Sequence, residues 1–193
     1  PFTFSVLIDE EGDGSCTAGP WEYVGATSLT SSWGPQGQPL LFNDAIWQTV
    51  DIPLDNDELV QGNLFGGNGV LDPSPSGFYT MDSLWYTISP SAGTNGLGPW
   101  EVFVDRVVAI DSNGSPIVLL DMEDGVNRLK FNRGQSTATI SSSTLSTLTS
   151  FDGLSSHRLL WTYPAGDDDA SLGMLQRVEF QCGTSALIPD DAT

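Results

Sequence analysis

The chain has 193 residues, which is enough for one sizeable hydrophobic core or two small ones. It contains 25 Asp and Glu residues but only six Lys and Arg residues, so its formal net charge is -19, and no basic residue precedes Arg106. This balance argues against nucleic acid and anionic lipid headgroups as partners, because both need cationic side chains to replace their counterions. The sequence also lacks an apolar run of about 18 residues, so we expect no membrane insertion.

Strand patterns follow one another along the chain, and helical periodicity is almost absent. The turns between them are rich in the 21 Gly and 12 Pro residues, and the Ser- and Thr-rich stretch 136–150 is predicted to be a polar edge strand. About nine to eleven strands without helices predict an all-β fold, a sandwich of two antiparallel sheets. The clearest predicted strands, in chain order, cover residues 2–9, 46–54, 84–88, 100–110, 117–122, 129–131, 157–163 and 172–180.

Some of these patterns also predict which side chains face the core. Even spacings place four residues on one face of their strand, Trp100, Val102, Val104 and Val108. Trp47 and Trp161 alternate with apolar neighbours and are expected in the core.

Cys16 and Cys182 are the only two cysteines, and no CxxC or Cys/His pattern indicates zinc. If the two thiols meet, they form one disulfide that closes a very long loop and stabilises the fold by about 4–5 kcal/mol in the chain-entropy description. The alternative is two unpaired buried thiols. A disulfide favours a secreted or extracellular protein. The chain begins at Pro1 within a predicted strand, so we expect a mature or excised part of something longer.

Four short segments carry a resemblance to a known group of domains. Residues 101–108 read EVFVDRVV and follow WQTVDIPL at 47–54, whereas LDMEDG at 120–125 precedes FDGLSSHRLLW at 151–161. These segments resemble the late-strand and early-strand motifs of jelly-roll carbohydrate-binding modules and galactose-binding-like domains of secreted bacterial proteins. The resemblance implies a jelly-roll, galactose-binding-like β-sandwich in a secreted or cell-surface protein.

The late-strand motif precedes the early-strand motif here, which is the reverse of the order in those domains. The chain is then a circular permutant whose last long strand lies beside its first, one period of a tandem array, or a subunit that exchanges its 120–193 half with a neighbour. Residues 1–193 are a single module in the simplest interpretation. Otherwise, residues 1–118 are the C-terminal part of one jelly roll and residues 119–193 the N-terminal part of the same permuted or a neighbouring one. Two incomplete domains are a further alternative.

Two groups of acidic residues are candidates for a structural calcium ion. The resemblance implies one site between the early-strand Glu123 and the late-strand Asp105, where a hard cation would join two sheet edges and offset clustered negative charge. The second candidate is the loop with Asp9, Glu11 and Asp13, which is rich in oxygen ligands and turn glycines but lacks the EF-hand spacing. The alternative for both groups is solvated acids that keep the protein soluble and discourage edge-to-edge pairing.

Three aromatic residues, Trp21, Tyr23 and Trp33, are candidates for binding carbohydrate, because the apolar face of a pyranose ring packs on an aromatic ring. Trp21 and Trp33 have Gly- and Pro-rich surroundings, as expected of loops. Exposed Trp side chains also anchor protein interfaces, so glycan binding and protein binding both stay open for these residues.

No catalytic pattern is present. His157 is the only histidine and is predicted to be a hydrogen-bonded structural residue, and neither a G-x-S-x-G nor an H-E-x-x-H motif occurs. We therefore expect no enzyme activity. One hypothesis is a non-catalytic extracellular structural module, a subunit or tandem repeat of a secreted filament or cell-surface assembly whose partners are copies of itself or neighbouring repeats. The alternative is a carbohydrate-binding module that recognises a polysaccharide and belongs to a larger secreted enzyme or adhesin. The reversed motif order favours the first.

Overall fold

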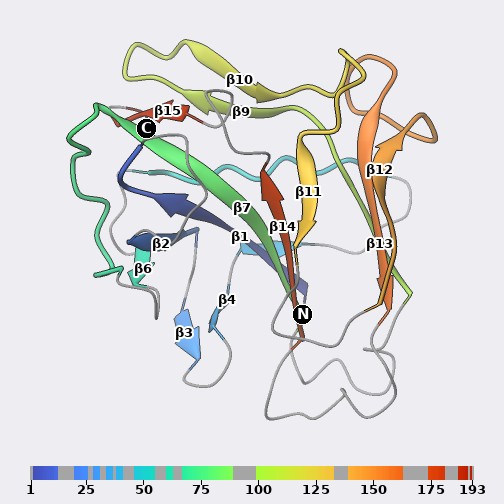
Figure 1. The fold of residues 1–193 in the computed structure, drawn as a ribbon, viewed down its shortest axis with the longest axis horizontal. Helices are drawn as coiled ribbons and strands as arrows, with labels where there is room; N and C mark the ends of the chain where they lie inside the picture. The colour runs from blue at the N-terminus through green and yellow to red at the C-terminus, as the bar shows by residue number, and fades with distance from the viewer. Residues whose placement is uncertain are drawn as a thin grey trace.

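The computed structural model describes residues 2–12, 20–25, 28–30, 34–36, 38–40, 46–54, 60–62, 67–88, 99–132, 139–162, 174–180, 187–190 and 192. Over these residues the chain is all-β and its strands form antiparallel sheets, which confirms the predicted fold class (Figure 1). The same residues contain no helix that is long and apolar enough to cross a membrane. The strands are β1 (Phe2–Asp9), β2 (Trp21–Val24), β3 (Ser28–Thr30), β4 (Gly34–Gln36), β5 (Gln38–Leu40), β6 (Val60–Gly62), β7 (Phe78–Ile88), β8 (Trp100–Val104), β9 (Val107–Ile110), β10 (Pro116–Leu120), β11 (Leu129–Asn132), β12 (Thr139–Ser146), β13 (Ser156–Thr162), β14 (Met174–Phe180) and β15 (Leu187–Pro189).

The largest sheet has eight strands and is built around β7, the longest strand. Its main order is β11-β14-β7-β1-β2-β6, with β15 also paired to β7 and β5 also paired to β1. One edge of β7 pairs with β1, and the other edge pairs with β14 and then β15. All of these pairings are antiparallel. Because β7 pairs with β1, β14 and β15, the sheet combines strands from the beginning, middle and end of the chain.

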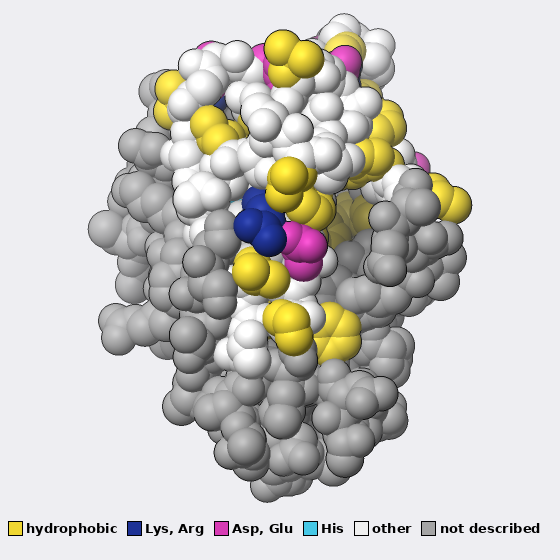
Figure 2. Space-filling view, turned by 90° about the vertical axis from the view of Figure 1, so that its right-hand side faces the viewer, with side chains coloured by type: hydrophobic (Ala, Val, Ile, Leu, Met, Phe, Trp, Pro, Cys, Tyr) yellow, Lys and Arg dark blue, Asp and Glu magenta, His cyan; other side chains and the backbone are white. Residues whose placement is uncertain are grey.

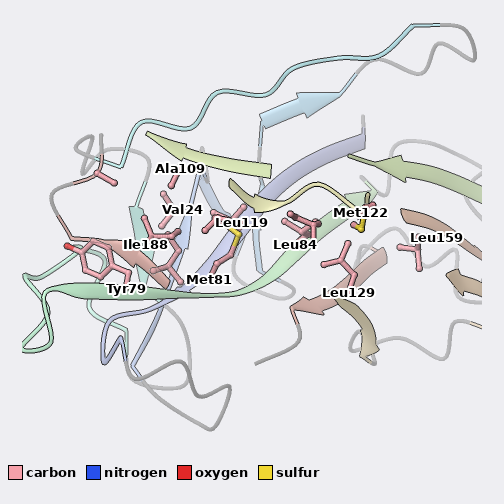
Figure 3. Packing of buried hydrophobic residues seen from close by; sticks show 14 of the residues in the cluster. Val24, Tyr79, Met81, Leu84, Ala109, Leu119, Met122, Leu129, Leu159 and Ile188 are labelled. Carbon is pink, nitrogen blue, oxygen red and sulfur yellow. The ribbon is translucent and has the colours of Figure 1, made fainter. Parts of the chain in front are cut away.

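The main hydrophobic core lies between this sheet and a second layer, which consists of the β9–β10 hairpin and the three-stranded sheet β12-β13-β8. Ile8, Leu84 and Ile188 enter the core from the large sheet, whereas Leu119 and Trp161 enter it from the second layer, and all five are at most 4% exposed. Figure 3 shows Leu84 and Ile188 on the face of the large sheet that is turned toward Leu119 of the second layer, so that the three side chains lie between the layers. Two layers packed over one core make a β-sandwich. Trp161 is a core residue as predicted.

The predicted strand 100–110 is two strands in the structure, β8 and β9. Arg106, which lies between them, has a φ of 49°, so the backbone turns out of the extended conformation at this residue. The side-chain alternation changes register there: Val107 packs against the core, whereas Val108 is 36% exposed. The prediction that Val108 shares a face with Val102 and Val104 is therefore wrong.

The predicted strand 46–54 is not a strand. Residues 46–54 pair with no neighbouring strand, although Ile52 and Leu54 still pack against the core. Pro53 lacks the N–H group that a ladder would need, so the segment buries alternate side chains without joining a sheet. The polar stretch 136–150, in contrast, contains β12, which pairs only with β13 among the described strands and is the edge strand that was predicted.

The two halves of the chain are interleaved within one molecule. β14 and β15 pair with β7 in the large sheet, and β13 pairs with β8 in the smaller one. The circular permutant predicts that β14 lies beside β1, but β7 lies between these two strands. Phe2 pairs with Ile88 at the end of β7, whereas Pro189 pairs with Phe78 at its start. Phe2 and Pro189 thus lie at opposite ends of β7. β14 and β1 are therefore both neighbours of β7 in the large sheet rather than of each other.

Candidate functional site

Asp105 and Glu123, the two acids that the resemblance brings together, bind the same loop in the structure. Asp105 follows β8, and its Oδ2 accepts hydrogen bonds from the backbone N–H groups of Phe151 and Asp152 at 2.8 and 3.1 Å. Glu123 follows β10, and its carboxylate accepts the N–H groups of Leu154 and Ser155 at 2.9–3.0 Å. Two carboxylates thus accept four backbone N–H groups of the loop between β12 and β13, those of residues 151, 152, 154 and 155, and hold this loop in a fixed position.

Local backbone conformation directs both carboxylates. Arg106 and Met122, each next to one of these acids, are the two non-glycine residues with positive φ among the described residues, at 49° and 61°. Such conformations cost about 1–2 kcal/mol each and persist only where surrounding contacts enforce them. Met122 is fully buried, and the Arg106 guanidinium forms an ion pair with Asp152 of the loop. Burial on one side and ion pairing on the other therefore hold the two acids toward the loop.

The geometry assigns these acids mainly to backbone donors. Asp105 Oδ1 is buried and has no hydrogen-bond partner, so this oxygen is left for a cation. Asp105 Oδ2 and both carboxylate oxygens of Glu123 accept backbone N–H groups instead. Among the described residues, no three or more His, Cys, Asp or Glu side chains come together as a metal-binding group. Calcium at Asp105 and Glu123 stays a prediction.

The second predicted calcium loop is only partly described. Asp9, at the end of β1, is 2% exposed, and its Oδ1 accepts the N–H of Glu11 at 2.8 Å. The side chain of Glu11 is exposed, and its carbonyl oxygen lies 3.4 Å from Ser74 Oγ. Asp13 lies outside the described residues. The described part of this loop therefore packs against residues 74–78 through its backbone.

A further group of carboxylates was not predicted from the sequence. Glu22 in β2 is fully buried, and its two oxygens accept the N–H groups of Asn68 and Gly69 at 2.5 and 3.0 Å. Glu10 accepts the N–H of Asp72 at 2.6 Å, and Asn68 Nδ2 donates to Asp72 Oδ2 at 2.8 Å. Loop 67–72 is thus held by two acids, Glu10 directly after β1 and Glu22 in β2, as loop 151–155 is held by Asp105 and Glu123. The sequence does place Glu22 between two aromatic residues of a strand, Trp21 and Tyr23, but it does not show which groups the Glu22 carboxylate binds.

The pKa values of Glu10 and Glu22 are raised, mainly by burial. Burial raises the pKa of Glu10 to about 7, and repulsion from Glu22, Asp72 and Asp9 adds to this, whereas the bond from Asp72 N opposes it. Burial also raises the pKa of Glu22, against the bonds from Asn68 and Gly69. Folding therefore favours the protonated form of both acids.

Glu10→Gln is expected to flatten the pH dependence of stability. The folded protein retains a proton on Glu10 between pH 4.5 and about 7, where the unfolded chain has lost it, so wild-type stability falls as the pH rises through this window. The difference between the two proteins should be about 1 kcal/mol across the window, because solvent screens a partly exposed carboxyl group. Urea unfolding from pH 4.5 to 8 measures it. Glu11→Gln removes the same charge from an exposed neighbour, and an equal flattening in that variant would contradict the assignment to Glu10.

Of the three aromatic residues predicted to bind carbohydrate, Trp21 and Tyr23 lie on the face of the large sheet that points away from the main core, and the third lies outside the described residues. Trp21 and Tyr23 are 8% and 6% exposed and form a second hydrophobic cluster with Leu7. As they lie, neither ring offers an open face to a sugar. Trp33, like both cysteines of the predicted disulfide, Cys16 and Cys182, lies outside the described residues.

His157 is a buried, hydrogen-bonded residue, as predicted. Its Nδ1 lies 3.0 Å from Asn127 Oδ1 and its Nε2 lies 3.3 Å from Ser143 Oγ. The side chain is fully buried, and burial lowers its pKa to about 4. The imidazole is therefore neutral at physiological pH and joins β13 to its neighbours.

The loop that Asp105 and Glu123 hold exposes large apolar side chains. Leu148, Phe151 and Leu154 are 73%, 56% and 78% exposed, and the ring of Phe151 packs edge-on against Trp47 with centroids 6.2 Å apart. We call Trp47, Leu148, Phe151 and Leu154 the apolar loop surface. Figure 2 looks at the side of the molecule that carries β12 and β13, and it shows hydrophobic side chains at several places between the top and the centre of this face and just below, with a basic and an acidic side chain next to each other near the centre. Exposed apolar side chains gathered at one place mark interaction sites more often than scattered ones do.

Gly153→Ala is expected to release Glu123 from this loop. Gly153 has a φ of 67°, and a Cβ there would lie 2.3 Å from Glu123 Cδ, so the carboxylate must swing away from the N–H groups of Leu154 and Ser155. Because Glu123 is a flexible side chain, the expected cost is about 1–2 kcal/mol rather than unfolding. Faster amide hydrogen exchange at Leu154 and Ser155 measures the release. Gly125 has a similar φ of 73° with no atom within 4 Å of the position of a Cβ, so Gly125→Ala is the control, and equal exchange rates in the two variants would contradict the role of Glu123.

Comparisons with protein families, with curated proteins and with solved structures find no match for this chain.

Proposed function

We propose that this chain is a non-catalytic structural module of a secreted or cell-surface assembly, and that it contacts its neighbour through the apolar loop surface. The observation that carries the proposal is the combination of exposure and fixation in loop 148–155. Three large apolar side chains stand in solvent, whereas the backbone below them is held by Asp105 and Glu123. A rigid apolar surface loses little entropy on binding, which is what a permanent contact needs.

The alternative, a carbohydrate-binding module, has less support from the described residues. Two of its three candidate aromatics, Trp21 and Tyr23, are buried side by side. Phe151 is 56% exposed, but the exposed side chains Leu148 and Leu154 of the same loop offer no amide or hydroxyl group to orient a sugar. A structural calcium at Asp105 is compatible with either function, because it would only stiffen the loop further.

A paired substitution tests the structural proposal. In the cells that produce the chain, the wild-type protein should be recovered in large extracellular or surface-bound particles, whereas Leu148→Ser/Leu154→Ser should be released as free protein. Val118→Ser is the matched control, because Val118 on β10 is 50% exposed and lies outside the apolar loop surface. Size-exclusion chromatography of the extracellular and surface fractions measures the distribution. Wild-type and loop variant in the same particles would refute the proposal, and release of the wild type by soluble polysaccharide would support the carbohydrate-binding alternative.

A further inference from the structure

We propose that the apolar loop surface binds a cationic, apolar segment of another polypeptide, with Lys or Arg residues next to large hydrophobic side chains. This inference rests on the proposed function and names the chemistry of the neighbour.

The first step is the rigidity of the surface. Besides the bonds from Asp105 and Glu123, Ser146 Oγ accepts the N–H of Leu148 at 3.2 Å, and Ser156 Oγ donates to the carbonyl oxygen of Thr149 at 2.6 Å. Ser150 Oγ donates to the carbonyl oxygen of Gly153 at 3.1 Å. Side chains at both ends and in the middle of the loop thus hold its backbone. The apolar side chains are presented in one arrangement before any partner arrives.

The second step is the charge around the surface. In the described part of the chain, Asp105 and Glu123 bind this loop and Asp152 belongs to it, whereas the cation found there is Arg106, which is already paired with Asp152. The N–H groups that bind Asp105 and Glu123 are dipoles and do not cancel their negative charges. A loop with exposed apolar side chains and an excess of carboxylates complements a segment that carries both apolar and basic side chains.

The third step excludes a second copy of the chain as the best partner. Among the described residues, Arg106, Arg128 and Arg158 are already used within the molecule, where they pair with Asp152, Asp124 and Glu101. A second copy brings another net charge of -19 toward the same carboxylates. Like charges at an interface are unfavourable and slow association. A partner of complementary, positive charge is therefore a segment of a different, basic polypeptide.

Fluorescence anisotropy with three short labelled peptides tests the inference on the full chain at physiological salt. A peptide of alternating Lys and Leu residues is expected to bind saturably, and peptides of Lys and Ser or of Glu and Leu are expected to bind at least about tenfold more weakly. Leu148→Ser/Leu154→Ser should weaken binding of the Lys and Leu peptide at least about tenfold, because each buried leucine contributes on that scale. Val118→Ser should bind as the wild type does.

Several results would overturn the inference, and they separate it from the proposed function. Equal binding of the Lys and Leu peptide to the wild type and the loop variant would show adsorption to acids elsewhere. Self-association of the wild type in sedimentation velocity, lost in the loop variant and without peptide binding, would assign the surface to a second copy and leave the proposed function standing. Loop-dependent binding to phosphatidylcholine vesicles in place of the peptide would contradict both.

Discussion

Gly12→Ala is expected to destabilise the protein by about 3 kcal/mol or more. Gly12 is buried with a φ of 58°, and a Cβ at this position would lie 1.7 Å from the carbonyl oxygen of Phe78. The obstacle is backbone at the start of β7, the central strand of the large sheet, so it cannot move aside as a side chain can. Overpacking and the disfavoured φ therefore add, which places this substitution among the most damaging single changes.

The same contact explains why the alanine variant should affect more than one loop. Ser76 Oγ lies 3.2–3.3 Å from the carbonyl oxygens of Glu11, Gly12 and Phe78, so this hydroxyl joins the turn after β1 to the start of β7. Glu10, two residues earlier, holds the N–H of Asp72. Displacement of Gly12 would loosen both attachments.

Chemical denaturation of Gly12→Ala and Gly77→Ala separates crowding from backbone conformation. Gly77 has a φ of 75° but has no atom within 4 Å of the position that a Cβ would occupy. Its replacement should cost about 1 kcal/mol, the price of the positive φ alone. Equal losses in the two variants would contradict the crowding at Phe78.

His157 is expected to stay neutral down to about pH 4 in the folded protein and to make the protein sensitive to acid. Burial lowers its pKa from 6.5 to about 4, so between these values the unfolded chain binds a proton that the folded protein does not. Stability conferred by neutral His157 is therefore complete above pH 6.5 and is lost as the pH falls toward 4. The expected loss is about 3 kcal/mol across this window.

Proton NMR measures this directly, because His157 is the only histidine and its ring Cε1–H signal needs no assignment among others. The signal of the folded protein should not move between pH 8 and 5. His157→Gln keeps an amide that can bond to Asn127 or Ser143, and its urea midpoint should lose less on acidification than that of the wild type. A signal that titrates near pH 6.5 in the folded protein would show that the imidazole is open to solvent.

Glu10 and His157 shift stability in opposite directions over overlapping pH ranges. Acidification from pH 7 restores the proton that Glu10 favours, whereas it removes the advantage of neutral His157. The two single variants are therefore needed to separate these contributions, since the wild-type profile contains both.

The sequence predicts strands well where alternation leads to pairing and poorly where alternation has another cause. β10, β11, β13 and β14 lie within about two residues of their predicted ranges. Segment 46–54 has the same alternation but lies along the core without a partner strand. The change of face at Arg106 was equally hidden, because a positive φ at a residue other than glycine depends on contacts made elsewhere.

The calcium site at Asp105 and Glu123 stays a prediction. The resemblance placed Asp105 and Glu123 together, and both acids do bind one loop, through its backbone N–H groups. The sequence did not indicate that Leu148, Phe151 and Leu154 stand in solvent, because apolar residues in a Ser- and Thr-rich stretch are expected to face the core. Their exposure follows from how the loop is held between β12 and β13.

The sequence by itself determined the all-β class and the excess of acid over base, because alternation, turn residues and charge are properties of the chain read in order. Only the tertiary structure decided which group each buried acid binds. Glu22 takes the N–H of Gly69, 47 residues away, and Glu123 takes the N–H groups of residues 31 and 32 positions away. Every residue except proline carries a backbone N–H, so no sequence pattern distinguishes the one that a carboxylate will reach. In a chain with few cations, the fold itself provides the donors that its acids need.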